Sequence, residues 1–218
     1  NAGLDAARQV FREGRFEEAA ALYAAVAAVS SGAVRADALI GSSTARYSNG
    51  DAEGALRAIE EAAQAAPEYS AESVSAGYLL GIRLQEAGRY EDGVIVLAKV
   101  MSRASALAPY IRFEYGRALA AAGRGAEAAT AWDGLLAEAG LPPGLRIQVL
   151  RERARIARMS GDLVELVRWL DALIGLNGDP SSTYTRARMA TAAGDAGLRQ
   201  RLLTSLVALQ PESTLAVQ

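Results

Sequence analysis

The side chains able to do chemistry in this chain are arginines, carboxylates, tyrosines and hydroxyls, because its 218 residues include no His and no Cys. Those two absences exclude disulfides, thiol nucleophiles, imidazole bases and the zinc or copper sites that use these ligands. Of the 23 basic residues all but Lys99 are Arg. Arginine chemistry is chiefly recognition, because the planar guanidinium forks a carboxylate with two hydrogen bonds.

Adjacent carboxylates occur at Glu17-Glu18, Glu60-Glu61 and Glu91-Asp92, and carboxylate pairs are the acid and base of glycoside hydrolysis. Neighbouring residues on a helix do not face each other, so we interpret all three pairs as residues of solvated helix faces. Gly123-Arg124-Gly125 lacks the lysine of a phosphate-binding loop, and serines such as Ser42 have no His to activate them. We therefore predict that the chain is not an enzyme, with no catalytic residue, no metal site and no cofactor.

Three arginines are the most distinctive group. Arg151, Arg155 and Arg158 have the spacing that places side chains on one face of a helix. Like charges on one face repel each other unless a partner neutralises them, so this row is a candidate site for a carboxylate-bearing ligand. The whole chain carries a net charge of −2, which argues against a general nucleic-acid binder.

The elements that must position these side chains are helices joined by glycine turns. Ala and Leu dominate the composition, while Pro is scarce, a balance that favours helix over strand. Glycines in small-Gly-charged turns recur at intervals of 36, 38, 35, 38 and 33 residues. They are Gly14, Gly50, Gly88, Gly123, Gly161 and Gly194. Each glycine suits the left-handed end of one helix, and the acids that follow suit the start of the next.

The same environment returns around each glycine. Seven residues earlier stand the small residues Ala7, Ser43, Gly81, Gly116, Ala154 and Ala187. Nine residues later stand the large residues Tyr23, Ile59, Leu97, Trp132, Leu170 and Leu203. Five residues later the first four hairpins have Ala19, Ala55, Gly93 and Ala128, whereas the last two have Leu166 and Arg199. The pattern predicts pairs of helices that approach closely at the small residues.

These repeats resemble the tetratricopeptide repeat (TPR) family, whose unit is about 34 residues of paired antiparallel helices. The resemblance covers nearly the whole chain. It implies an all-α fold, a right-handed superhelix of about six antiparallel hairpins forming a single domain over residues 1–218. The Gly-Arg-Tyr and Gly-Arg-Phe turns are also similar to those in the superhelical region of soluble lytic transglycosylases, although no segment matches that family's catalytic Glu-Ser motif.

The repeat pattern predicts hairpins near residues 4–30, 33–66, 72–105, 108–139, 144–176 and 182–210. First helices are expected at 4–13, 33–49, 72–87, 108–122, 144–160 and 182–193, and second helices at 16–30, 52–66, 90–105, 126–139, 163–176 and 196–210. The first helices together carry a net charge of +7 and the second helices −6. In TPR arrays the first helices line the concave side, so the resemblance implies a positive groove on an acidic protein.

Groove-facing positions lie ten, six and three residues before each glycine. From these positions, with Tyr110 one turn earlier, we predict a partner-binding groove that is basic toward the C-terminal half. Its residues are Tyr47, Tyr78, Tyr110, Phe113, Arg117, Arg151, Arg155, Arg158, Tyr184 and Arg188. The alternative interpretation is structural, with the tyrosines stacked on neighbouring hairpins and the arginines paired with nearby acids such as Glu114 and Glu152.

The predicted function is that of a non-catalytic scaffold whose groove binds a protein or peptide, with carboxylates favoured and no nucleic acid. One alternative is an accessory helical domain of a bacterial cell-wall enzyme. Another is a ligand-sensing domain of a signalling or transcription protein. The longest apolar run, 19–29, is 11 residues and short of a membrane span. The start at Asn1 without Met indicates a processed or excised fragment, with an extracytoplasmic location favoured over the bacterial cytoplasm.

Overall fold

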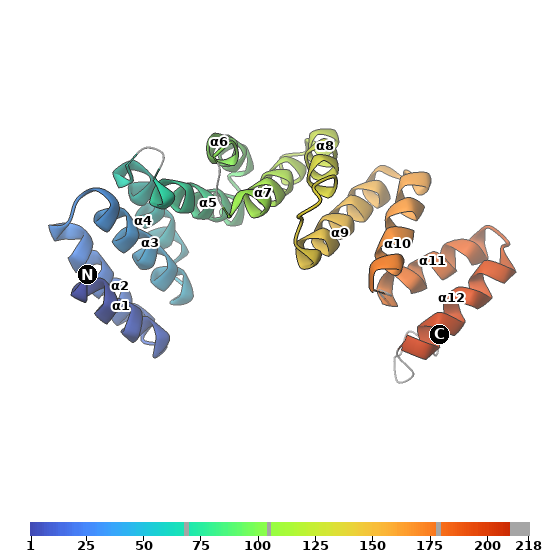
Figure 1. Ribbon diagram of the computed structural model, residues 1–218, viewed down its shortest axis with the longest axis horizontal. Helices are drawn as coiled ribbons and strands as arrows, with labels where there is room; N and C mark the ends of the chain where they lie inside the picture. The colour runs from blue at the N-terminus through green and yellow to red at the C-terminus, as the bar shows by residue number, and fades with distance from the viewer. Residues whose placement is uncertain (68–69, 104–105, 178–179, 210–218) are drawn as a thin grey trace. The chain divides into compact units, whose positions relative to one another are not determined.

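The computed structural model describes residues 1–67, 70–103, 106–177 and 180–209, and within these ranges all regular structure is α-helical (Figure 1). The first helices of the hairpins are α1 (Ala2–Arg12), α3 (Gly32–Ser48), α5 (Ala71–Glu86), α7 (Ala108–Ala121), α9 (Pro143–Ser160) and α11 (Pro180–Ala192). The second helices are α2 (Phe16–Val29), α4 (Ala52–Ala65), α6 (Tyr90–Met101), α8 (Gly125–Leu136), α10 (Leu163–Asn177) and α12 (Ala196–Leu209). The predicted all-α class and its alternation of first and second helices are confirmed.

A left-handed glycine stands at each predicted turn. The six turn glycines have φ between 73° and 84°, a region that residues with a Cβ rarely adopt. At the fifth turn Gly161 is the C-cap of α9, and the backbone N–H of Asp162 donates to the carbonyl of Ala157 at 3.0 Å. The glycine therefore closes one helix and reverses the chain within two residues.

The residue after the glycine starts the second helix in one of two ways. At three turns it is Asp, and its carboxylate accepts from a backbone N–H three residues on. These bonds join Asp51 to Gly54 at 2.8 Å, Asp162 to Glu165 at 3.0 Å and Asp195 to Leu198 at 2.8 Å. The bond from Gly54, and then the Arg46 guanidinium, lower the pKa of Asp51. Each Asp satisfies a donor that the helix itself cannot.

At the other three turns the residue is Arg, whose guanidinium donates to an acid three residues on. Arg15 donates to Glu18 at 2.6 Å, Arg89 to Asp92 at 2.8 Å and Arg124 to Glu127 at 2.7 Å. Arg89 and Arg124 also reach the preceding second helix, where they pair with Glu60 and Glu91 at 3.2 Å. The turn arginines thus link neighbouring hairpins as well as starting a helix.

Small residues allow the two helices of a hairpin to touch. A Cβ built on Gly81 of α5 would lie 2.4 Å from the Leu97 side chain of α6, so any larger residue there would force Leu97 to shift. In the second hairpin the buried hydroxyl of Ser43 donates to the carbonyl of Ala55 at 2.7 Å. The large residues expected nine positions after the glycine are buried in the first five hairpins, with Ile59 and Leu97 at 0% exposure, whereas Leu203 of the sixth is half-buried. The repeat pattern therefore predicted the cores of the first five hairpins correctly.

The chain divides into two compact units, Asn1–Ala131 and Trp132–Gln218, with the division inside α8. We call them unit 1 and unit 2. In unit 1 consecutive first helices pack against each other, α1 on α3, α3 on α5 and α5 on α7. In unit 2 the core joins α9 and α10 through Leu150, Ala154, Ala157, Leu166, Trp169, Leu170 and Leu173. The prediction of a single domain over 1–218 stays a prediction.

Helix ends differ from the expected positions more than helix starts do. The second helix expected to reach residue 105 ends at Met101, and the one expected to reach 139 ends at Leu136. The Arg146 side chain donates to the carbonyls of Leu136 and Glu138 at 3.0 and 3.1 Å, so a neighbouring helix satisfies the end of α8. Conversely, α11 starts at Pro180 rather than at residue 182, because proline is preorganised for the first helical position.

Candidate functional site

Unit 2 contains a pocket that collects the three predicted arginines of α9. It has a volume of about 350 Å³ and is lined by residues of α9, α10 and α11. Its lining residues are Arg151, Ala154, Arg155, Arg158, Leu166, Leu170, Leu173, Ser181, Ser182 and Thr185. The leucines are buried and form an apolar floor, whereas Arg151 and Arg158 are exposed. We call this site the arginine pocket.

The charged residues that line the arginine pocket are all arginines. Among the described residues that line it there is no Asp or Glu. Arg155 donates to Glu152 on its own helix at 2.7 Å, while Arg158 forms no ion pair with another described residue. The hydroxyls of Ser181, Ser182 and Thr185 add polar groups on the α11 side. Such a lining can bind a carboxylate or another oxyanion above an apolar surface.

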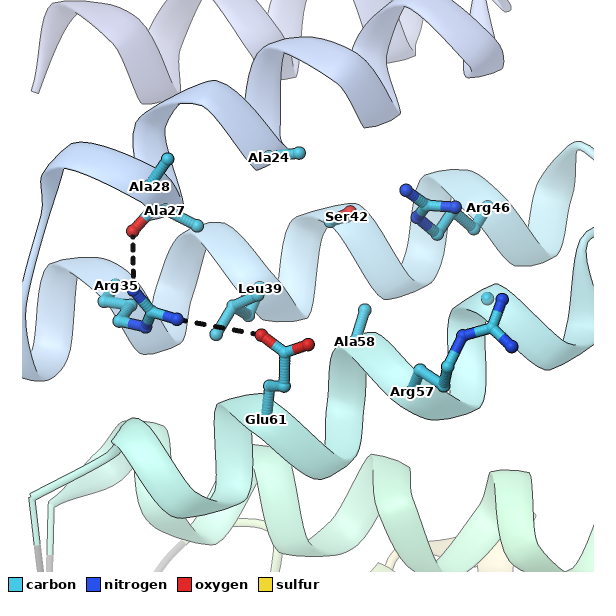
Figure 2. Close-up of a pocket in the computed structure, with 11 residues that line it drawn as sticks. Ala24, Ala27, Ala28, Arg35, Leu39, Ser42, Arg46, Arg57, Ala58 and Glu61 are labelled. Carbon is cyan, nitrogen blue, oxygen red and sulfur yellow. Dashed lines mark hydrogen bonds and ion pairs between the residues drawn. The ribbon is translucent and has the colours of Figure 1, made fainter.

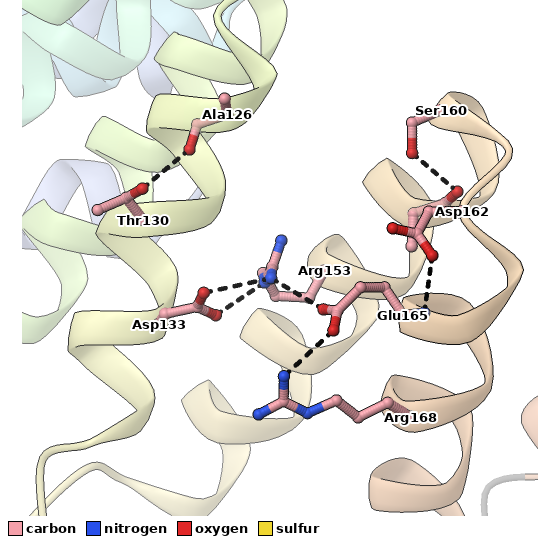
Figure 3. A network of polar contacts seen from close by, with 9 residues as sticks. Ala126, Thr130, Asp133, Arg153, Ser160, Asp162, Glu165 and Arg168 are labelled. Atoms are coloured by element: carbon pink, nitrogen blue, oxygen red, sulfur yellow. Dashed lines mark hydrogen bonds and ion pairs between the residues drawn. The ribbon is translucent and has the colours of Figure 1, made fainter.

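Arg153, on the same helix, has a structural role in unit 2. Arg153 is buried and donates to Asp133 at 2.8 and 3.2 Å and to Glu165 at 3.3 Å (Figure 3). Its guanidinium also lies 4.7 Å from the ring centroid of Trp169, which Arg168 approaches at 4.6 Å. These contacts tie α9 to α8 and α10 and hold the opposite arginine row in place.

The sites predicted in unit 1 lie mostly within contacts between hairpins. The guanidinium carbon of Arg83 in α5 lies 3.5 Å from the ring centroid of Tyr47 in α3. The Tyr47 hydroxyl donates a hydrogen bond to the Glu86 carboxylate at 3.1 Å. Arg117 pairs at 3.2 Å with Glu114, which also accepts from Gln85 at 3.4 Å. The structural alternative therefore describes Tyr47 and Arg117 well.

The remaining predicted aromatics differ in exposure. Phe113 is only 7% exposed, so it belongs to the core rather than to a binding surface. Tyr78 is half-buried, and burial, followed by the Glu114 charge, raises the pKa of its hydroxyl. Tyr110 is exposed. In unit 2 Tyr184 is half-buried and Arg188 exposed. A groove running through residues of both units stays a prediction.

Unit 1 has a pocket of its own, about 330 Å³ in volume, between α2, α3 and α4 (Figure 2). Its basic residues already have partners. Arg35 donates to the carbonyl of Ala27 at 3.2 Å and pairs with Glu61 at 3.7 Å, and Arg46 pairs with Asp51 at 2.9 Å. Arg57 pairs with Glu53. This pocket is the weaker candidate for an anionic ligand, because each of its arginines has an ion-pair partner, whereas Arg158 of the arginine pocket forms none with another described residue.

Sequence reasoning found the basic side of the arginine pocket and missed its floor and its hydroxyls. Leu166 lines the floor at the position where the first four hairpins have Ala or Gly. That departure was visible in the sequence and was the available signal. The hydroxyls were missed because Ser181 and Ser182 were expected in or beside a loop, whereas they belong to the first turn of α11.

In the part of the chain that the structure describes, no helix has the length and apolarity to cross a membrane. Nor do the described His, Cys, Asp and Glu side chains form a group of three that could hold a metal ion. The adjacent acids considered above have arginine partners at Glu18, Glu60, Glu61, Glu91 and Asp92.

Comparison with known proteins shows the fold. No protein-family model and no curated protein matches the chain. Among solved structures it is similar to PilW, a widely conserved type IV pilus biogenesis factor, with a TM-score of 0.69 and 15% identity over 100% of this chain and 96% of that one.

Two further solved structures are similar. Pseudomonas aeruginosa PilF matches with a TM-score of 0.67 and 18% identity over 99% of this chain and 94% of PilF. The TPR-like repeats of a Podosopora anserina kinesin light chain match with a TM-score of 0.66 and 19% identity over 80% of this chain and 93% of theirs. The fold of this chain is TPR-like, as its repeats predicted.

Proposed function

We propose that this chain is a non-catalytic scaffold that binds a segment of another protein through its first helices, and that the bound segment carries carboxylates. The observation that carries the proposal is the arginine pocket, where three cations of α9 meet with no acid among the described lining residues. Guanidinium groups held on one rigid helix lose little freedom on forking a carboxylate.

The fold supports the same role. A TPR-like array presents the side chains of successive first helices, and extended surfaces of this kind suit a protein segment better than a small substrate. The adjacent carboxylates outside the arginine pocket support this role too. Those that pair with arginines, such as Glu60 and Glu91, link neighbouring hairpins. Binding rather than catalysis is the chemistry that these side chains offer.

Selection from a random twelve-residue peptide library, displayed on phage against the immobilised full chain, tests this proposal. We expect the selected peptides to be enriched in Asp and Glu, and their binding to weaken when salt rises from 50 to 500 mM, because salt screens charge pairs at a surface. A library that yields no peptide specific for the chain would contradict the proposal, as would selected peptides with no excess of acids.

A further inference from the structure

The apolar floor of the arginine pocket extends beyond the pocket. Leu163, Leu166, Leu170 and Leu173 have spacings of three, four and three residues, so they form one stripe along α10. Leu166, Leu170 and Leu173 are buried and line the pocket. Leu163, at the start of the helix, is 63% exposed. The stripe therefore leads from the pocket floor to the surface at the turn between α9 and α10.

The basic side of the pocket leads to the same turn. A nitrogen of the Arg155 guanidinium lies 3.3 Å from the sulfur of Met159, whose residue is 73% exposed. Val164, beside Leu163, is 81% exposed. Met159, Leu163 and Val164 are thus three exposed apolar residues around the fifth turn, and Met159 contacts one of the arginines. We call these three residues the turn patch.

This turn differs from the others in its sequence. The second residue of the second helix is Glu17, Glu53 and Glu91 in the first three hairpins, where a carboxylate favours the positive end of the helix. In the fourth, fifth and sixth hairpins that position is Ala126, Val164 and Gly197, so the fifth alone has a large apolar residue there. In the first hairpin, moreover, the apolar turn residue Phe16 is covered by Phe11, with ring centroids 5.3 Å apart. The fifth turn keeps Glu165 in the first turn of its second helix and exposes the apolar side chains of Leu163 and Val164 beside it.

We propose that the arginine pocket and the turn patch form one docking site for a segment that carries acidic and apolar side chains together. The inference rests on the proposed function and names the class of partner. Acids of the segment contact Arg155 and Arg158, and its apolar residues lie along the leucine stripe and on the turn patch. Charge complementarity selects this occupant, because the charged lining residues are all arginines and Arg158 forms no ion pair with another described residue. An apolar contact next to a charge pair also excludes water from it.

Binding of fluorescein-labelled peptides from the phage selection to the full chain, followed by fluorescence anisotropy, tests the inference. Arg158→Glu reverses one pocket charge and should weaken binding at least tenfold. Leu163→Ser removes the outer end of the stripe and should weaken it at least fivefold. The matched controls are Arg57→Glu and Val29→Ser, which change an exposed cation and an exposed apolar residue in unit 1. Both controls should bind within twofold of the original chain.

Each result has a defined meaning. Replacing the acids of the peptide by Gln should remove most of the effect of Arg158→Glu, which would support direct pairing. Peptides that bind the chain yet are insensitive to both Arg158→Glu and Leu163→Ser would overturn this site and leave the proposed function standing. Loss of binding to Arg158→Glu alone would overturn the apolar half of the inference. A dimer of the chain that dissociates with Leu163→Ser in light scattering would assign the turn patch to a second copy and also overturn it.

Discussion

The arginines of α9 show how the same residue type takes two roles on one helix. Arg153 points to the core, where Asp133, Glu165 and Trp169 surround it. Arg151 and Arg155 lie two residues away and Arg158 five residues away, on the face that lines the pocket. A buried guanidinium that is bonded to two carboxylates stabilises the packing of helices, whereas Arg158, which forms no ion pair with another described residue, can pair with a ligand.

Replacing Arg153 tests the structural role. We expect Arg153→Ala to lower the free energy of unfolding by about 1–3 kcal/mol, because it removes charge-assisted hydrogen bonds and a stacked contact. The two carboxylates are partly exposed and regain water, which limits the loss. Arg158→Ala on the same helix should change it by less than about 0.5 kcal/mol. Urea unfolding followed by circular dichroism and Trp fluorescence measures the free energy of unfolding of both variants. Equal losses of stability in the two variants would contradict the division of roles.

The capping carboxylate of Asp51 gives a pH dependence. Its pKa lies below the ordinary value of 3.8 in the folded chain, chiefly because of the bond from the Gly54 N–H. Stability from this group is therefore complete above about pH 4 and is lost as the pH falls through the lower, folded pKa. Asp51→Asn keeps a capping oxygen without a titrating charge. The difference in melting temperature between the two proteins should shrink as the pH falls from 6 to 3, and a constant difference would contradict this origin.

At the scale of the hairpin, the turn glycines and the small residues of the interfaces carry the fold. Their spacing was sufficient to predict where each helix pair turns and which residues are buried, because close approach and the left-handed conformation restrict residue type strongly. The ends of α6 and α8 were predicted less well. Arg146 bonds the last carbonyls of α8 from another helix, and a contact of that kind leaves no local pattern in the sequence.

Substitution of the fifth turn glycine tests the hairpin directly. We expect Gly161→Ala to cost about 1–2 kcal/mol, because a residue with a Cβ is strained at a φ of 73°. Gly144 is the matched control, since it lies in the first turn of α9 and a Cβ there meets no atom within 4 Å. Gly144→Ala should be stabilising by about 0.5–1 kcal/mol. Thermal unfolding that shows the two substitutions to be equivalent would contradict the role of the left-handed turn.

At the scale of the whole chain, the repeat sequence predicted a TPR-like array but contained no sign of a division into two units. The division falls inside α8, between Ala131 and Trp132, in a hairpin whose repeat pattern is as regular as the others. The arginine row was predictable because its charges are local to one helix. The complete pocket was not, since its floor and hydroxyls come from α10 and α11 and depend on how three helices pack.

A fragment tests whether unit 1 folds without unit 2. Residues 1–140 contain the whole of unit 1 and the rest of α8. Because each repeat packs against its neighbours only, we expect this fragment to keep a helical circular dichroism spectrum and to melt cooperatively. A fragment without helical signal, or one that melts without a transition, would show that the units depend on each other for folding.

Hydrogen–deuterium exchange of the full chain, with and without a saturating acidic peptide from the phage selection, tests the central claim most directly. The measurement reports each backbone segment separately, so it locates the bound peptide without any substitution. The account predicts slower exchange on binding in the segments that contain Arg151 to Val164 and Ser181 to Thr185, with little change in α2 and α4. Protection confined to unit 1, or protection nowhere at saturating peptide, would contradict the assignment of the arginine pocket as the binding site.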